Sequence, residues 1–200
     1  MKNICEHLTY WNARNPNNIG IQTLNGSLTF RVIFQLTKRI VIALRKNNIK
    51  YGDTACILNT DPIESWLLFL GLSHEGVTAS FSVPSRLPTT DYEFDWYLSP
   101  SAIEIDSQKP LITDKAWFEN LKEISPQEIK NVLPKKLEAN HINHIVLTSG
   151  TTGKPKPIPT TIKSLAEKIT MYQYYLNPKP EICFMSLSTG VGLNYALSSL

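Results

Sequence analysis

The sequence lacks the features that mark several large classes of protein. It has three cysteines, Cys5, Cys56 and Cys183, and their spacing suits neither a disulfide framework nor a metal site. No apolar run is long enough for a membrane-spanning helix, and the first residues lack the apolar region of a signal peptide. We therefore expect buried thiols in a reducing compartment, no membrane span and a cytoplasmic location.

A strong excess of one charge is also missing. The chain carries 20 lysines and arginines against 17 acidic residues, a formal net charge of +3, so nothing indicates nucleic acid or an anionic membrane as its main partner. A hydrophobic content of 42% excludes a disordered chain, and 200 residues suffice for one domain with a substantial core. Any affinity for phosphate must therefore come from a local group of residues.

Strand patterns and helix patterns alternate along the chain. Short apolar runs that suit strands occupy residues 55–58, 77–83, 145–147 and 182–187. Apolar residues recur at helical spacing in residues 33–44, 63–74 and 165–176. This alternation predicts an α/β fold with a mostly parallel sheet flanked by helices. Residues 85–140 show no clear pattern.

Two local signals sharpen this assignment. Asn25-Gly26, between residues 19–24 and 27–30, is the dipeptide that best fits a type I′ turn and predicts a β-hairpin. Asp61-Pro62 predicts an N-cap and a first-turn proline for the helix that follows.

The most informative segment is the run Thr148-Ser149-Gly150-Thr151-Thr152-Gly153-Lys154-Pro155-Lys156, directly after the strand at 145–147. Its glycines allow positive φ angles and let backbone amides approach an anion. Its hydroxyls add donors, its two lysines add positive charge, and Pro155 stiffens the segment between them. The run predicts a polyphosphate-binding loop at the carboxyl end of a strand, where ligands bind in open α/β sheets.

Two alternatives to that interpretation need weighing. A Walker A loop has four residues between its first glycine and the Gly-Lys pair and then Ser or Thr, whereas here two residues separate Gly150 from Gly153 and Pro155 follows Lys154. An ordinary surface loop also uses Gly, Thr, Lys and Pro, but with no preference for this order.

Other candidate residues have simpler explanations. His141 and His144 have a ligand-like spacing, yet no Cys, Asp or Glu cluster completes a metal shell, so we expect a loop-to-strand boundary there. Trp66, Trp96 and Trp117 are expected in core and rim packing rather than as stacking platforms for bases.

The Thr/Gly/Lys run resembles the phosphate-binding signature of the adenylate-forming (AMP-binding) superfamily, which includes acyl-CoA synthetases, peptide-synthetase adenylation domains and luciferases. Ser27–Phe30, Lys50–Asp53 and residues 67–84 are similar to earlier elements of that family, so the resemblance covers essentially the whole chain. It implies the N-terminal subdomain of an adenylate-forming enzyme, with residues 1–200 as a partial AMP-binding domain.

The resemblance also implies a reaction. A carboxylate attacks the α-phosphorus of ATP, giving an acyl-adenylate and pyrophosphate, and the acyl group then passes to a thiol of CoA or a carrier protein. Residues carried over by the motif would form the ATP phosphate site with Mg²⁺ as cofactor: Thr151, Thr152 and Gly153 around the β- and γ-phosphates, Gly150 in the same loop, Lys154 and Lys156 as countercharges, and Thr148 or Ser149 near the metal.

The chain departs from the family pattern in three places. Pro157-Ile158-Pro159 follows Lys156, where members usually have Gly and β-branched residues, and two prolines should stiffen the exit from the loop. Thr189 stands where many members place a His or an aromatic residue over the acyl pocket, which makes it an acyl-pocket candidate. The sequence stops at Leu200 before the family's downstream motifs and C-terminal domain.

We therefore expect a truncated gene product, a deliberately shortened polypeptide or one half of a split protein, inactive alone. Exposed apolar surface at residues 182–200 would promote self-association or pairing with the missing C-terminal portion. Three functions remain open: the N-terminal part of an acid–thiol ligase, a non-catalytic nucleotide-binding or interaction module, and an unrelated nucleotide hydrolase.

Overall fold

The computed structural model describes residues 3–23, 26–83, 92–103, 109–148, 155–175, 187, 192–193 and 196–197. Six strands form the main sheet: β3 (Thr54–Ile57), β4 (Thr78–Phe81), β5 (Trp96–Ser99), β6 (Lys109–Ile112), β7 (Ile142–Thr148) and β8 (Lys156–Thr161). Their order is β6-β5-β3-β4-β7-β8, and only β8 runs antiparallel to its neighbour. The predicted α/β fold with a mostly parallel sheet is confirmed.

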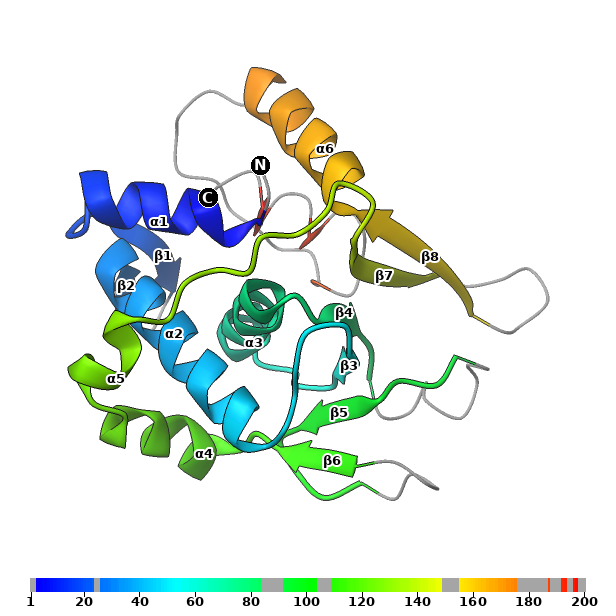
Figure 1. The fold of residues 1–200 in the computed structure, drawn as a ribbon, viewed down its shortest axis with the longest axis horizontal. Coiled ribbons are helices and arrows are strands. Elements are labelled where there is room, and N and C mark those ends of the chain that lie inside the picture. The colour runs from blue at the N-terminus through cyan, green and yellow to red at the C-terminus, as the bar shows by residue number, and fades with distance from the viewer. Residues whose placement is uncertain are drawn as a thin grey trace.

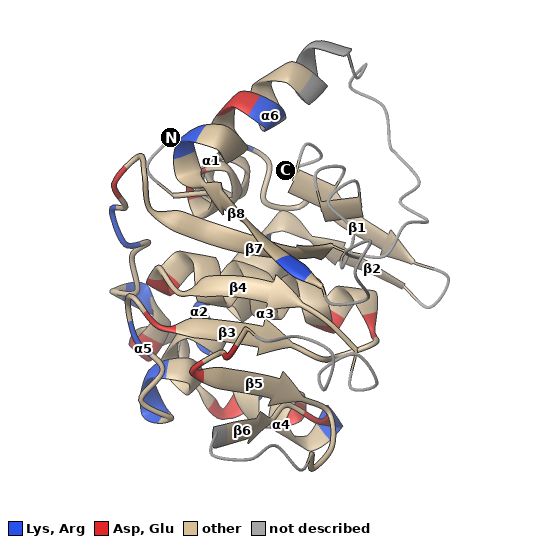
Figure 2. Ribbon diagram, turned by 90° about the vertical axis from the view of Figure 1, so that its right-hand side faces the viewer, with Lys and Arg blue, Asp and Glu red and all other residues tan. Residues whose placement is uncertain are grey.

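Helices cover one face of this sheet (Figure 1). They are α1 (Cys5–Arg14), α2 (Phe30–Lys46), α3 (Pro62–Glu75), α4 (Lys115–Asn120), the 3-10 turn η2 (Leu121–Glu123), α5 (Pro126–Lys130) and α6 (Ile162–Tyr175). Figure 2 shows the sheet from its other face, with α2 and α3 behind the strands. Among the described residues, no helix has the length and apolar character needed to cross a membrane.

The helix α3 begins and ends as its sequence predicts. The Asp61 carboxylate accepts hydrogen bonds of 2.9 Å from the amides of Ile63 and Glu64, and Pro62 occupies the first turn. Gly76 ends the helix in the left-handed region, with φ 79°. Because α3 links β3 to β4, these caps fix the parallel pair at the centre of the sheet.

The predicted hairpin is present, but its predicted register is wrong. β1 (Ile19–Thr23) and β2 (Gly26–Thr29) are antiparallel, and Thr23 pairs with Gly26. Gly26 therefore lies in the ladder, with residues 24 and 25 between the strands, and Asn25-Gly26 does not form the two-residue turn. The side chains of Gln22 and Thr23 both donate to the Gly26 carbonyl, at 3.2 and 3.1 Å, which explains why this register is favoured over the turn preference.

Successive side chains along a strand point to opposite faces of the sheet, so the apolar residues of the strands form two clusters. The main core lies on the helix side and includes Ile57, Phe81 and Leu98 of the sheet together with α2 and α3. A smaller cluster on the opposite face contains Cys56 and Tyr97 with their neighbours Leu58, Phe94 and Ile145. Cys5 and Cys56 are buried free thiols as predicted, while Cys183 lies outside the described residues.

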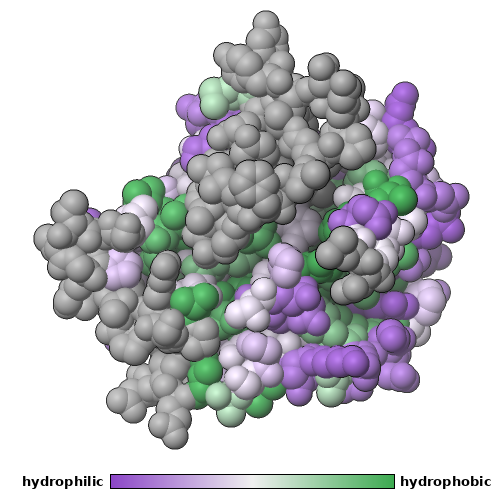
Figure 3. Space-filling view, turned by 180° about the vertical axis from the view of Figure 1, so that it is seen from behind, coloured by the Kyte–Doolittle hydropathy of each residue, from purple (hydrophilic) through white to green (hydrophobic). Residues whose placement is uncertain are grey.

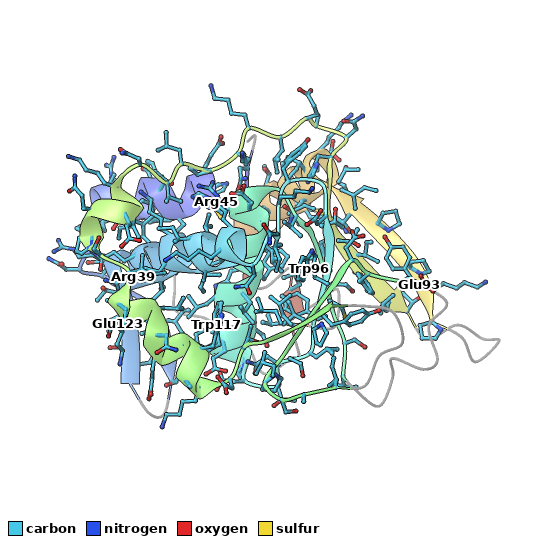
Figure 4. The ribbon with its side chains drawn as sticks, turned by 60° about the horizontal axis from the view of Figure 1, so that its bottom comes forward. Arg39, Arg45, Glu93, Trp96, Trp117 and Glu123 are labelled. Carbon is cyan, nitrogen blue, oxygen red and sulfur yellow. The ribbon has the colours of Figure 1, made fainter. Side chains whose placement is uncertain are left out.

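Tertiary contacts order described residues of the segment 85–140, which shows no clear sequence pattern. Lys38 on α2 donates to the carbonyl of Ile129 at 3.1 Å, and Arg39 donates to the carbonyl of Ile124 at 3.2 Å. Figure 4 shows Arg39 beside the turn that carries Glu123. These bonds hold η2 and α5 against α2. Trp66 is buried, and Trp96 and Trp117 are half-buried against the main core, so their predicted packing role is confirmed.

The described part of the C-terminal segment is not exposed, contrary to our expectation of an apolar surface there. Leu187, Leu193 and Leu197 are buried in the main core with Leu165 and Ile169 of α6. These three side chains are thus withdrawn from water. The strand predicted at 182–187 lies outside the described residues except for Leu187.

Candidate functional site

The phosphate-loop sequence connects two antiparallel strands, β7 and β8. Thr148 pairs with Lys156 at the end of the ladder, and the Thr148 hydroxyl donates to the Lys156 carbonyl at 3.2 Å. Ser149, Gly150, Thr151, Thr152, Gly153 and Lys154 lie outside the described residues, as does Thr189. The structure therefore places the neck of the predicted loop, with Thr148, Pro155 and Lys156.

A strand–loop–strand arrangement differs from that of a Walker A loop. In a P-loop the glycine-rich segment leads directly into a helix, whose N-terminus contributes to phosphate binding. Here Lys156 enters β8, and α6 begins only at Ile162. This arrangement argues against an unrelated P-loop hydrolase, as the residue spacing did.

The side chains of Thr148 and Lys156, the paired residues of the neck, project to one side of the sheet. Residues directly opposite in an antiparallel pair point to the same face, so the side chains of Thr148 and Lys156 lie on the face shared with His144. The His144 ring contacts Phe69 of α3 and Phe81 of β4, both with centroids 5.9 Å away. The neck residues therefore face the helix side, where Lys156 is exposed.

No sequence pattern predicted β8, because two of its six residues are proline. Pro157 lies opposite Leu147 and Pro159 opposite Ile145. Proline lacks an N–H and is tolerated in sheets on edge strands, and β8 is the edge of the six-stranded sheet. The prolines that were predicted to stiffen the chain after the loop thus lie in an edge strand, and this strand pairs Lys156 with Thr148.

The connectivity also marks a position at the sheet edge that the sequence did not identify. After β3 the chain crosses to β4 through α3 on the helix side, whereas Tyr92 and Phe94, the described residues before β5, pack in the cluster on the opposite face. Adjacent parallel strands whose connections leave on opposite faces form the usual ligand crevice of open α/β sheets. Residues 59–61 and 82–83 stand at this edge, and β7 with Thr148 is the next strand.

Histidine does not supply positive charge to this region at neutral pH. Burial lowers the pKa of His144 to about 3, with a smaller contribution from Lys168. Burial followed by Arg45 and Lys38 lowers the pKa of His74 to about 3. Burial also lowers the pKa of His7 and His141. Countercharge for phosphates must therefore come from lysine and arginine.

The other reactive side chains that the structure describes are structural. Burial raises the pKa of the Cys5 and Cys56 thiols, so they stay protonated and are poor nucleophiles. His141 directly precedes β7 as predicted, whereas His144 lies within the strand and is buried. Within the described ranges, no three His, Cys, Asp or Glu side chains come together in a way that could hold a metal ion.

In sequence, the chain is similar to two curated enzymes. No protein-family model matches the sequence. The 2-succinylbenzoate–CoA ligase of Bacillus licheniformis is 25% identical over 158 residues, which cover 73% of this chain and 31% of that protein. Enterobactin synthase component E of Escherichia coli is 22% identical over 216 aligned positions, which cover 94% of this chain and 39% of that protein. The chain thus spans about a third of the length of these curated relatives.

Solved structures share the fold over the whole chain. VinN in complex with L-aspartate has a TM-score of 0.83 at 15% identity, over 98% of this chain and 54% of VinN. The fatty acyl-adenylate ligase from L. pneumophila, in complex with acyl adenylate and pyrophosphate, has a TM-score of 0.78 at 16% identity, over 100% of this chain and 38% of that one. At these identities the likeness shows the fold.

Proposed function

We propose that this chain, which is similar in sequence and fold to the N-terminal portion of adenylate-forming ligases, forms part of an ATP-dependent ligase that adenylates a carboxylic acid. The observation that carries the proposal is the β7–β8 hairpin, because it holds the Thr/Gly/Lys signature at the carboxyl edge of the parallel sheet. The partners of the complete protein would be a small carboxylic acid and a thiol acceptor, either CoA or a carrier protein.

The proposed reaction places specific demands on the loop. The acid's carboxylate oxygen attacks the α-phosphorus of ATP, and the bond to the bridging oxygen of pyrophosphate breaks. Negative charge develops on the leaving pyrophosphate, so Lys154 and Lys156 would stabilise it electrostatically. The amides and hydroxyls of Thr151, Thr152 and Gly153 would orient the β- and γ-phosphates. The acyl-adenylate would then transfer its acyl group to the thiol, with release of AMP.

Thr148 fits a magnesium ligand chemically. Its hydroxyl proton is donated to the Lys156 carbonyl, which leaves lone pairs on a hard oxygen, the ligand type that Mg²⁺ prefers. The described residues contain no cluster that would hold the ion by itself, so we expect it to bind together with the nucleotide's phosphates. When bound, it would supply charge stabilisation to the pyrophosphate.

Removal of Lys154 tests the site directly. Lys154→Ala should weaken binding of magnesium–ATP by about tenfold or more, because a charge-assisted hydrogen bond contributes about 1.5–3 kcal/mol. Titration calorimetry of both proteins measures this. The matched control is Lys163→Ala, which removes one exposed lysine from α6. Equal ATP affinities for all three proteins would remove Lys154 from the site.

Isotope exchange between ATP and pyrophosphate, measured over a panel of carboxylic acids, separates the remaining functions. Acid-dependent exchange by the complete protein supports the ligase, whereas ATP binding without exchange indicates a non-catalytic nucleotide-binding module. We expect no exchange from residues 1–200 alone, because they span about a third of the relatives and offer charge on one side of the reacting phosphorus. Exchange by the 200 residues that is lost in Lys154→Ala would contradict the inactivity of this chain.

A further inference from the structure

The basic residues of this chain are concentrated at its beginning. Residues 7–52 contain seven lysines and arginines and no aspartate or glutamate. The seven are Arg14, Arg31, Lys38, Arg39, Arg45, Lys46 and Lys50. The overall charge of +3 conceals this local excess.

Four of the seven basic residues have partners within the fold. Lys38 and Arg39 donate to the carbonyls of Ile129 and Ile124, at 3.1 and 3.2 Å. Arg45 binds the buried Glu75 carboxylate at 2.6 Å, and Lys46 lies 3.8 Å from Glu128. These side chains hold α3 and α5 against α2, so they are not available to a partner protein.

Arg14 and Arg31 are different, since both are exposed and neither forms an ion pair with a described residue. They lie near each other, because the Arg31 amide donates to the Pro16 carbonyl at 2.9 Å, close to where α1 ends at Arg14. The Arg14 guanidinium lies over the Tyr10 ring, with its carbon 5.9 Å from the ring centroid. Two cations therefore project from one corner of the molecule.

Aromatic and aliphatic side chains are exposed on the same elements as these arginines. Tyr10 is 52% exposed and meets Trp11 edge-on at 5.2 Å, and Trp11 stacks on Phe30 at 5.8 Å. Ile19 is 57% exposed and Val32 is 37% exposed. We call this set the α1–hairpin surface: Tyr10, Trp11, Arg14, Ile19, Arg31 and Val32.

This surface is well separated from the proposed ATP site. In Figure 1, α1, β1 and β2 lie on the left, and the ends of β7 and β8 at Thr148 and Lys156 lie on the right. Figure 3, seen from behind, shows hydrophobic residues flanked by hydrophilic ones on the side of the β1–β2 hairpin. A partner bound there would leave the nucleotide loop free.

We infer that the α1–hairpin surface docks an acidic partner protein through a helix that presents carboxylates beside an apolar stripe. Tyr, Trp and Arg are the residues that dominate binding energy at protein interfaces, and all three occur here together. Arg14 beside the exposed Tyr10 ring, together with Arg31, selects an anionic partner by charge complementarity, since neither arginine has an ion pair among the described residues. The inference does not depend on the proposed ligase function.

An anionic membrane is a poorer match for the same residues. Membrane sites that bind by charge gather about four to eight basic residues. The α1–hairpin surface offers two. Its apolar residues are spread over the end of α1, β1 and the first turn of α2, rather than along one amphipathic helix. This distribution suits a protein surface.

The probe is a synthetic helix of about 20 residues, long enough to be helical in water, with Glu on one face and Leu on the other. A second peptide keeps the Leu pattern and replaces every Glu by Lys. Binding to the 200-residue chain is measured by fluorescence anisotropy at low and at high salt. The acidic peptide should bind, and its affinity should fall with salt because exposed charges are screened. The basic peptide should bind at least about tenfold more weakly.

The double variant Arg14→Ala/Arg31→Ala should lower the affinity for the acidic peptide by about tenfold or more. The matched control, Lys50→Ala/Lys163→Ala, removes two exposed positive charges elsewhere and should bind as the unmodified chain does. Circular dichroism verifies that each variant is folded.

Four results would overturn the inference. One is absence of binding by the acidic peptide, and another is an equal loss of affinity in the two double variants. The third is sedimentation that shows a dimer dissociated by Arg14→Ala/Arg31→Ala, since a second copy would then occupy the surface. The fourth is stronger arginine-dependent binding to phosphatidylcholine–phosphatidylserine vesicles than to the peptide.

Discussion

Mild acid should destabilise this protein, because its two most buried histidines are held neutral. His74 and His144 are 2% and 4% exposed, and burial lowers the pKa of each to about 3. In the unfolded chain both regain a pKa near 6.5. The unfolded state therefore binds more protons below pH 6.5, so the free energy of unfolding falls as pH decreases from there toward 3.

The magnitude follows from proton linkage. Between pH 7 and pH 5, each histidine lowers the free energy of unfolding by about 2 kcal/mol, so the pair lowers it by about 4 kcal/mol. Typical domains have about 5–15 kcal/mol in total, so this loss is large. His7 and His141 act in the same direction, since burial lowers their pKa too. Carboxylates titrate mainly below pH 5, so the change in the free energy of unfolding between pH 7 and pH 5 reports mainly on the histidines.

Urea denaturation at pH 7, 6 and 5, followed by circular dichroism, measures the effect. In His144→Phe, whose ring would pack between Phe69 and Phe81, the loss of stability between pH 7 and pH 5 should be about half that of the unmodified chain. A change below about 1 kcal/mol in the unmodified chain would refute the reasoning, as would an unaltered pH dependence in the variant.

Two further predictions concern glycines. Gly71→Ala should gain about 1 kcal/mol from the higher helix propensity of alanine. Its new Cβ would, however, meet Ile40 Cγ2 and lie 3.1 Å from Ile40 Cβ. Overpacking of about 1–3 kcal/mol should therefore give a net loss in the free energy of unfolding. Urea denaturation should show a smaller loss of stability in an Ile40→Leu background, because leucine has no methyl group on its β-carbon. A Gly71→Ala protein more stable than the unmodified chain would contradict this prediction. Gly52→Ala and Gly76→Ala both place alanine at positive φ, but only at Gly76 does the new Cβ meet side chains, Tyr51 Cδ2 at 2.6 Å and Leu137 Cδ2 at 2.8 Å. Gly76→Ala should therefore cost about 1 kcal/mol more than Gly52→Ala by the same measurement, and equal losses would mean loose packing at Gly76.

The sequence predicted elements well where a local interaction sets them. Asp61-Pro62 specified the start of α3, because the capping carboxylate and the amides it binds are two and three residues apart. The apolar face of α2 followed from its spacing, since a helix brings those residues together. The Thr/Gly/Lys run identified a family resemblance that the comparisons confirm.

Prediction failed where other interactions outweigh the preference of the residues themselves. The Asn25-Gly26 turn signal lost to side-chain bonds from Gln22 and Thr23. β8 escaped detection because its prolines argue against a strand, and only a position at the sheet edge makes them acceptable. Exposed apolar surface was expected at residues 182–200, yet the described leucines Leu187, Leu193 and Leu197 are buried in the main core.

Local patterns were enough to predict the fold class, the capped helix α3, the buried thiols Cys5 and Cys56 and the phosphate-loop signature, because each depends on residues close together in the chain. Long-range pairing instead set the antiparallel arrangement of β7 and β8, the order of the strands, and the approach of the Arg31 backbone to the end of α1. These features arise from sheet order and from contacts between distant segments. The stability of such contacts depends on burial and on partner residues far away in the sequence, which no local pattern encodes.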